Sequence, residues 1–241
     1  MTTGTAGRLA VWSPWVRQVL KCVNDTRCRA WDLLHGVETC GVIPLTRFEF
    51  ESESKTPGLE YSSSHPRIIR RALRALDLPL ERYAFVDMGC GKGRVLLLAS
   101  ELPFARIVGV EFVPQLAEIA RQNVRTHRRA TQHSRAIEVL TLDATDYYFP
   151  SEPQVLYFAN PFMREQMDKV RRNLEASLRK SPREVIVIYQ GLLDRRDETF
   201  GSRTNYECLH RERYFDIYRC RPKATVKGWA DSNLGRREVM A

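Results

Sequence analysis

Long apolar runs and paired cysteine motifs are both missing from this chain of 241 residues. A membrane-spanning helix needs roughly 20 consecutive apolar residues, and no stretch approaches that length. The first residues also lack a charged and then apolar leader that ends in a small-residue cleavage site. We therefore expect a cytoplasmic protein without a membrane partner.

The six cysteines include no Cys-x-x-Cys pair. Zinc sites are often built from such pairs, and disulfide frameworks belong to short secreted chains. The sequence therefore predicts neither a metal site nor a disulfide framework. Cys90 lies between two glycines, where a small side chain that simply fits is favoured over a nucleophile. No internal repeat is visible.

Charge and hydrophobic content set broad limits on the class of protein. Apolar residues make up 43% of the chain, which is enough to fill the core of one ordinary domain. The formal net charge of +9 raises the possibility of a nucleic-acid partner. The basic residues are spread over several segments, however, and some complement the C-terminal dipole of a predicted helix. The favoured interpretation is that most basic side chains lie on solvent-exposed faces.

The most informative motif covers residues 86–94 and reads Val-Asp-Met-Gly-Cys-Gly-Lys-Gly-Arg. The apolar run before it predicts a buried strand, and residues 94–101 predict the start of a helix. Glycines allow a positive φ and a close approach of the backbone to a ligand, and a helix N-terminus presents free amide donors. The pattern predicts a nucleotide-binding loop whose glycines are Gly89, Gly91 and Gly93.

Two acids identify the ligand that this loop would bind. A second apolar strand, predicted over residues 106–111, ends at Glu111, where a doubly wound sheet places the acid that holds two ribose hydroxyls. Asp87 stands two residues before the first glycine, where it would repel a pyrophosphate. The dinucleotide fingerprint is G-x-G-x-x-G, whereas the spacing here is G-x-G-x-G. S-adenosylmethionine (SAM), a cationic adenosine ligand without phosphate, is favoured over NAD or a flavin.

From residue 83 to about residue 189 the chain resembles the Rossmann-like core of class I SAM-dependent methyltransferases. Asp87 and the three glycines match motif I, Glu111 matches the acid that closes the second strand, and Asp143 matches the acid near the adenine amino group. The wider chain, including residues 31–39, is similar to bacterial methyltransferase-domain proteins. The resemblance implies an enzyme with SAM as cofactor and S-adenosylhomocysteine as product.

Asn160, Pro161 and Phe162 follow an apolar run and fall at motif IV of this family, beside the transferred methyl group. They resemble the (D/N)-P-P-(Y/F) motif of amino-group methyltransferases but lack its second proline, a departure that argues against an adenine or glutamine acceptor. As catalytic residues, the Asn160 oxygen would accept the hydrogens of an amine and Phe162 would wall in the acceptor. A simple turn after a strand is the alternative.

The resemblance also implies a set of cofactor-binding residues. Tyr61 and Ser64 fall on an aromatic-x-Pro-Thr segment that touches the methionine end of SAM in related enzymes, although Ser63 replaces the proline. A capping role for both is equally open. The complete cofactor set is Tyr61, Ser64, Asp87, Gly89, Cys90, Gly91, Gly93, Glu111, Phe112, Asp143, Ala144 and Asn160.

Three regions are expected along the chain: residues 1–60 as an N-terminal helical extension or lid, residues 61–220 as the methyltransferase core, and residues 221–241 as a basic tail. Helix and strand patterns alternate through the core, which predicts an α/β fold with a doubly wound, mostly parallel sheet. The resemblance makes it seven-stranded, closed by an antiparallel hairpin. The elements are expected as helices at 13–23, 27–34, 66–76, 114–127 and 163–180, strands at 137–142, 154–159 and 184–189, and hairpin strands at 205–209 and 213–220.

Two classes of function stay open at this point. An N-methyltransferase would act on an amine nitrogen of a small molecule or of a protein side chain. An RNA or DNA methyltransferase would use the basic surface and would lose affinity steeply with salt. A protein that only binds SAM is disfavoured because both acids and Asn160 are present.

Overall fold

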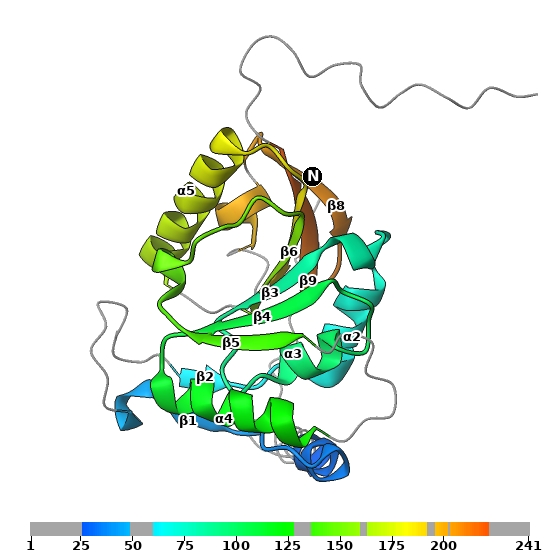
Figure 1. Cartoon of the computed structure of the whole chain (residues 1–241), viewed down its shortest axis with the longest axis vertical. Helices are drawn as coiled ribbons and strands as arrows, with labels where there is room; N and C mark the ends of the chain where they lie inside the picture. Colours follow the sequence, from blue (N-terminus) through cyan, green and yellow to red (C-terminus); the bar gives the residue numbers. More distant parts are fainter. Residues whose placement is uncertain are drawn as a thin grey trace, which may run out of the picture.

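The computed structural model describes residues 26–48, 60–127, 136–159, 163–191, 196–201 and 203–221. The predicted helix at 13–23, the tail beyond residue 221 and the Asn160–Phe162 tripeptide lie outside these ranges. The described part forms one large sheet flanked by helices, with a small two-stranded sheet beside it (Figure 1).

The large sheet has seven strands in the order β5-β4-β3-β6-β7-β9-β8. The five strands from β5 to β7 run parallel, whereas β9 is antiparallel to both β7 and β8. This order confirms the predicted doubly wound α/β sheet with a closing antiparallel hairpin. The strands are β3 (Ala84–Met88), β4 (Arg106–Glu111), β5 (Ile137–Thr141), β6 (Gln154–Ala159), β7 (Val185–Gln190), β8 (Tyr206–Arg211) and β9 (Phe215–Cys220).

The helices cover both faces of the sheet, as Figure 1 shows. Residues 26–35 are helical and precede the core. The helices α2, α3 and α4 lie on one side and α5 on the other. The bounds are α2 (Pro66–Arg74), α3 (Arg94–Ala99), α4 (Pro114–Thr126) and α5 (Arg164–Lys180), with short turns η2 (Leu80–Arg82), η3 (Ala144–Asp146) and η4 (Asp197–Gly201).

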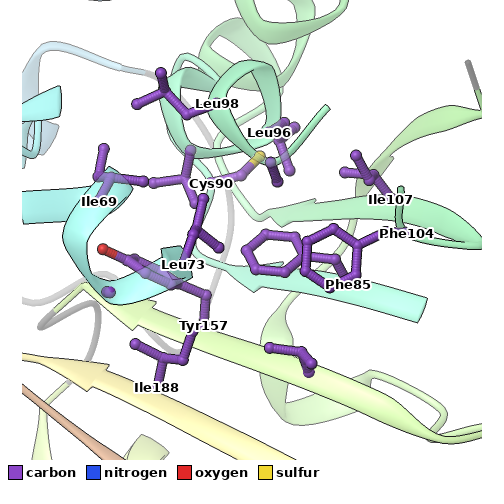
Figure 2. Close-up of a cluster of buried hydrophobic side chains, with 14 of the residues drawn as sticks. Ile69, Leu73, Phe85, Cys90, Leu96, Leu98, Phe104, Ile107, Tyr157 and Ile188 are labelled. Carbon is purple, nitrogen blue, oxygen red and sulfur yellow. The ribbon is translucent and has the colours of Figure 1, made fainter. Parts of the chain in front are cut away.

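The central strand β3 is buried along its whole length, as expected for a parallel strand with helices on both faces. Alternate side chains enter two different cores. Phe85 packs with Leu96, Phe104 and Ile107 in the cluster under α2 and α3 (Figure 2), and Val86 packs in the cluster under α5. The chain leaves β3 toward β5 and then crosses back to β6, so the strand order reverses beside β3. Doubly wound folds bind their ligands at this edge.

The small sheet was not predicted. It pairs β1 (Val42–Pro44) with β2 (Glu60–Ser62), and Ile43 lies opposite Tyr61. The turn η1 (Leu45–Arg47) follows β1, and Leu45 packs against Val113 of the core. Strands of three residues are too short to show an alternating pattern, so the sequence held no signal for this pair. Other expected elements agree to within about two residues at their ends, which is normal for helix and strand boundaries.

A buried ion pair joins the hairpin to the segment before η4. The side chains of Arg196 and Asp216 are both 0% exposed, with 2.7 Å between Nη1 and Oδ1. The Tyr218 hydroxyl donates to the second oxygen of Asp216, and Arg196 donates to the carbonyl of Glu212. The pair therefore holds the edge of the sheet together.

Asp216→Ala should lower the free energy of unfolding by about 3–5 kcal/mol, because it leaves a buried guanidinium without its partner. Urea unfolding followed by circular dichroism measures this loss. Glu207→Ala is the control: its contacts with Arg219 and Arg221 are partly exposed, so its cost should stay below about 1 kcal/mol. Equal losses in the two variants would contradict the role assigned to the buried pair.

Candidate functional site

The loop between β3 and α3 has the conformation that its glycines make possible. Gly89, Gly91 and Gly93 all have a positive φ, at 88°, 53° and 86°, a region that side chains other than glycine rarely adopt. Space is limited as well, because a Cβ on Gly91 would lie 2.4 Å from Cε2 of Tyr61. The predicted strand, glycine turn and helix are therefore confirmed.

Glu111, at the end of β4, lies beneath this loop and is 4% exposed. Its carboxylate accepts hydrogen bonds from the backbone N–H of Gly91 (2.8 Å) and of Val113 (2.9 Å). Burial raises its pKa to about 7, although these backbone donors oppose the rise. The Phe112 N–H is a third backbone donor, and a carboxylate has about four lone-pair sites, so these amides still leave capacity for a ligand. Its binding of ribose hydroxyls stays a prediction.

Asp87 is the most unusual side chain of the site. It is 1% exposed, and neither carboxylate oxygen has a hydrogen-bond partner among the described residues. Burial, and secondly the negative charge of Glu111, raises its pKa well above the ordinary value. A buried charge without a partner is costly, so such groups in folded proteins generally have an unusual role. The position at the switch point of the sheet is that of a ligand group.

Tyr61 and Ser64 lie close to the loop and to the strand ends beside it, and their contact with the methionine end of SAM stays a prediction. The Tyr61 ring packs against Gly91, and its hydroxyl donates to the carbonyl of Thr39. The Ser64 hydroxyl oxygen accepts a hydrogen bond from Nε2 of Gln190 (3.1 Å), while Oε1 of Gln190 accepts one from Tyr157. These contacts tie the segment before α2 to the ends of β6 and β7.

Cys90 is buried, and its thiol lies close to β4. A Cβ on Gly109 would come within 2.8 Å of the Cys90 sulfur, so both residues need to be small. Burial, Glu111 and Asp87 raise the pKa of the Cys90 thiol well above its ordinary value. Since the thiolate is the reactive form, these facts support the simple fit over a nucleophile. The sequence analysis missed Gly109, although a glycine inside a strand is a known sign of close packing.

The remaining cofactor candidates follow β4 and β5 at the same edge. Phe112 packs beside Leu45, Val113 and Tyr61. Asp143 caps η3 by accepting a hydrogen bond from the Thr145 N–H (2.8 Å), and the buried Ala144 begins that turn. A contact of Asp143 with an adenine amino group stays a prediction.

Asn160, Pro161 and Phe162 lie outside the described residues, but their neighbours are described. Ala159 ends β6, which is paired with β3, and Met163 precedes α5. A pocket of about 200 Å³ begins at Met163, and Met167 and Tyr189 also line it. Its other lining residues are Arg164, Asp168, Glu198, Thr199 and Arg203.

A metal site and a membrane-spanning helix are both absent from the described ranges. No group of three or more His, Cys, Asp or Glu side chains in the described ranges could hold a metal ion. Among the described helices, none is long and apolar enough to cross a membrane.

The strand order and the glycine turn at the switch point are those of a doubly wound sheet with a nucleotide-binding loop. Residues 85–181 match the protein-family model described as a methyltransferase domain. This match covers the strands from β3 to β6, with the glycine loop between β3 and α3, and α5. The resemblance seen in the sequence is therefore confirmed.

One curated relative is a protein-L-isoaspartate O-methyltransferase from Methanopyrus kandleri, 32% identical over 92 residues. The match spans 37% of this chain and 38% of that relative. Similar solved structures include an RNA methyltransferase from Salinibacter ruber in complex with S-adenosyl-L-homocysteine, at 19% identity, with 70% and 99% of the two chains covered and a TM-score of 0.46. A predicted N6-adenine-specific DNA methylase from Listeria monocytogenes has 14% identity, 66% and 52% coverage and a TM-score of 0.49.

Asp87→Asn should stabilise the protein without ligand, and more so at pH 8 than at pH 5. The folded state raises the pKa of this acid, so the fold binds a proton that the unfolded chain releases, and stability falls as pH rises from about 4 toward the raised pKa. Asparagine does not titrate, so Asp87→Asn does not lose this stability as pH rises. Scanning calorimetry should show an increase of about 3 °C or more at pH 8.

The matched control for this measurement is Glu118→Gln. Glu118 is exposed, and its ion pairs with Arg121 and Arg125 lower its pKa. This change should give no increase in melting temperature. A wild-type protein that melts at or above the temperature of Asp87→Asn at pH 8 would mean that Asp87 has a partner in solution.

Proposed function

We propose that this protein is a SAM-dependent methyltransferase that acts in the cytoplasm on an amine nitrogen of a small molecule or of a protein side chain. The observation that carries the proposal is the buried carboxylate of Asp87 beside a glycine turn, which has no hydrogen-bond partner in the part of the chain that the structure describes. An ammonium group or a hydroxyl is the partner that such a carboxylate needs. The methyltransferase domain over residues 85–181 agrees with it.

The residues of the site fit SAM as the cofactor. Asp87 would hold the ammonium end, directly or through water, while the positive-φ glycines let the loop backbone pass close to the ligand. Glu111 would hold the ribose hydroxyls with the lone pairs that its three backbone donors leave free. Asp143 and Ala144 would line the adenine. A pyrophosphate would meet two buried acids and is therefore disfavoured.

When bound, SAM supplies an activated methyl group on a cationic sulfur. After the transfer the cofactor is the neutral thioether S-adenosylhomocysteine. The acceptor nitrogen must arrive without its extra proton so that its lone pair is available. The oxygen of Asn160 would accept a hydrogen of the amine and direct that lone pair, and Pro161 and Phe162 would shape the acceptor side. Because no covalent intermediate is needed, positioning by these residues provides most of the rate.

The pocket at the start of α5 supports a small or slender acceptor. Met163, Met167 and Tyr189 form the apolar part of its lining, within a volume of about 200 Å³, and polar or charged side chains form the rest. The arginines at its rim lie next to acids, with Arg164 at 3.8 Å from Glu198 and Arg203 at 3.6 Å from Asp168. Because these charges balance, the pocket is suited to a slender amine better than to a phosphate chain.

An RNA or DNA acceptor is the second candidate, and one observation favours it. Four arginines of α2, namely Arg67, Arg70, Arg71 and Arg74, line a groove of about 490 Å³. Arg70 pairs with Glu101 and Arg71 with Glu212, which reduces the positive charge available for phosphates. This is why the amine acceptor is preferred.

Isothermal calorimetry should detect S-adenosylhomocysteine binding with a dissociation constant in the micromolar range or tighter. Asp87→Ala and Glu111→Ala should abolish it, because each removes a carboxylate that holds the ligand. Asn160→Ala should keep the affinity and lose turnover. Unchanged binding in both acid variants would refute the cofactor site, and an equal loss of binding and turnover in Asn160→Ala would remove Asn160 from the acceptor role.

Incubation of methyl-labelled SAM with size-sorted fractions of a cell lysate identifies the acceptor class. We expect label in small amines or in protein, with Asp87→Ala as the inactive control. Label in nucleic acid, with a yield that falls steeply between about 50 and 200 mM salt, would replace the amine acceptor by the second candidate.

A further inference from the structure

The segment from residue 26 to residue 48 lies directly on the glycine loop, and Arg94 makes the link. Arg94 follows the last glycine of the loop, and its side chain is only 3% exposed. It contacts Asp32 (Nη2 to Oδ1, 3.1 Å), donates to the Thr39 hydroxyl (2.7 Å) and donates to the Ser64 carbonyl (3.1 Å). Its guanidinium also lies over the Trp31 ring. The Arg94 side chain, at the start of α3, therefore makes its contacts within the protein and not with solvent.

Asp32 organises the other side of this link. It is 7% exposed, and its Oδ2 accepts the backbone N–H groups of Thr39 and Cys40, each at 2.6 Å. Its Oδ1 accepts the Thr39 hydroxyl (2.6 Å) in addition to Arg94. One carboxylate therefore shapes the turn after the first described helix and binds that turn to the loop.

These contacts form a closed ring around the loop. Asp32 binds Thr39, and the Thr39 carbonyl accepts a hydrogen bond from the Tyr61 hydroxyl. The Tyr61 ring in turn packs on Gly91. Gly91 is bound from beneath by Glu111. The ring closes through the loop itself, which continues from Gly91 to Arg94.

A second bridge reinforces the ring. Lys92 of the loop pairs with Glu38 (Nζ to Oε1, 2.6 Å), although that carboxylate is largely exposed. The Asn123 amide in α4 donates to the carbonyls of both Lys92 (2.8 Å) and Glu38 (2.9 Å) and accepts the Glu38 N–H (2.8 Å). Figure 1 shows the blue N-terminal segment beside α4.

From this ring we infer that Asp32 is a positioning residue of the cofactor site: it acts through Arg94 and Thr39 to hold the glycine loop and Tyr61 in the geometry that binds the ligand. The inference rests on the proposed function and deepens it. A loop with three glycines loses much conformational entropy when it is ordered, so contacts that order it beforehand raise affinity. Residues 26–48 lie outside the matched range of 85–181, so this contribution comes from the chain's own extension.

The test is calorimetric titration of S-adenosylhomocysteine into the full chain carrying Asp32→Asn. Asparagine keeps the shape but removes the charge that pairs with Arg94, and its amide cannot accept all the donors that Asp32 serves. We expect affinity at least about tenfold weaker than wild type, as for the loss of one buried charge pair. Asp216→Asn is the matched control, since Asp216 is equally paired with a buried arginine but lies away from the loop.

The two variants separate positioning from mere stability. Asp216→Asn should lower the melting temperature and change the affinity by less than about twofold, in line with the independence of distant sites. The inference is overturned if Asp32→Asn lowers the melting temperature in the same way and binds as tightly as wild type. If wild-type protein itself does not bind the ligand, the proposed function fails, and this result is distinct from the previous one.

Hydrogen exchange of the wild-type protein provides a second measurement that does not depend on a variant that folds. The Thr39 and Cys40 N–H groups donate hydrogen bonds to Asp32. Ligand binding should slow hydrogen exchange at these two amides and at the Gly91 amide. Slowing confined to residues 89–93, with residues 39 and 40 unchanged, would overturn the inference. Arg94→Lys, which keeps the charge but loses the fork of donors, should weaken binding in the same direction as Asp32→Asn.

Discussion

A buried carboxylate at the end of the central strand, without a partner among the residues that the structure describes, is the constraint on which the site depends. Asp87 lies in a fully buried strand, and neither of its carboxylate oxygens has a hydrogen-bond partner among the described residues. The ordinary solution in a protein core would be a hydrophobic residue, which would also continue the apolar strand. The chain keeps an acid where it is costly, and it does so where the strand order reverses and a glycine turn exposes the backbone. Function explains this placement better than stability does.

Two acids contact the glycine turn or the residues next to it. Glu111 binds the Gly91 amide from the end of β4, and Asp32 holds Arg94 and, through Thr39, Tyr61. Each acid comes from a different part of the chain, and neither contacts the other's partner. The turn has little intrinsic preference for one conformation, so tertiary contacts have to supply it.

The large sheet could be predicted from sequence because its signals are local. Apolar runs such as 154–159 mark buried strands, Pro114 marks the start of α4, and the three glycines of the loop need the positive φ that they adopt. The strand order followed from the resemblance. The acids Asp87 in β3 and Glu111 in β4 were also visible in the sequence. Their proximity could be expected, because strand ends in a parallel sheet meet at one edge.

The sheet of β1 and β2 and the role of Arg94 could not be predicted. Three-residue strands show no period, and an arginine that begins a helix is most often in solvent. Its contact with Asp32 joins positions 62 residues apart, a distance over which no local pattern carries information. Asp32 stood within a segment similar to bacterial methyltransferase-domain proteins, but that similarity did not show which residue it contacts.

The ring through Tyr61, Thr39, Asp32 and Arg94 also bears on where the folding unit begins. The family model matches residues 85–181, yet a fragment cut to that range would lack both the contacts of residues 26–64 with the glycine turn and the three strands β7, β9 and β8 that complete the sheet. The matched range is therefore shorter than the sheet and its contacts. Any shortened version intended to bind the ligand has to begin upstream of Trp31.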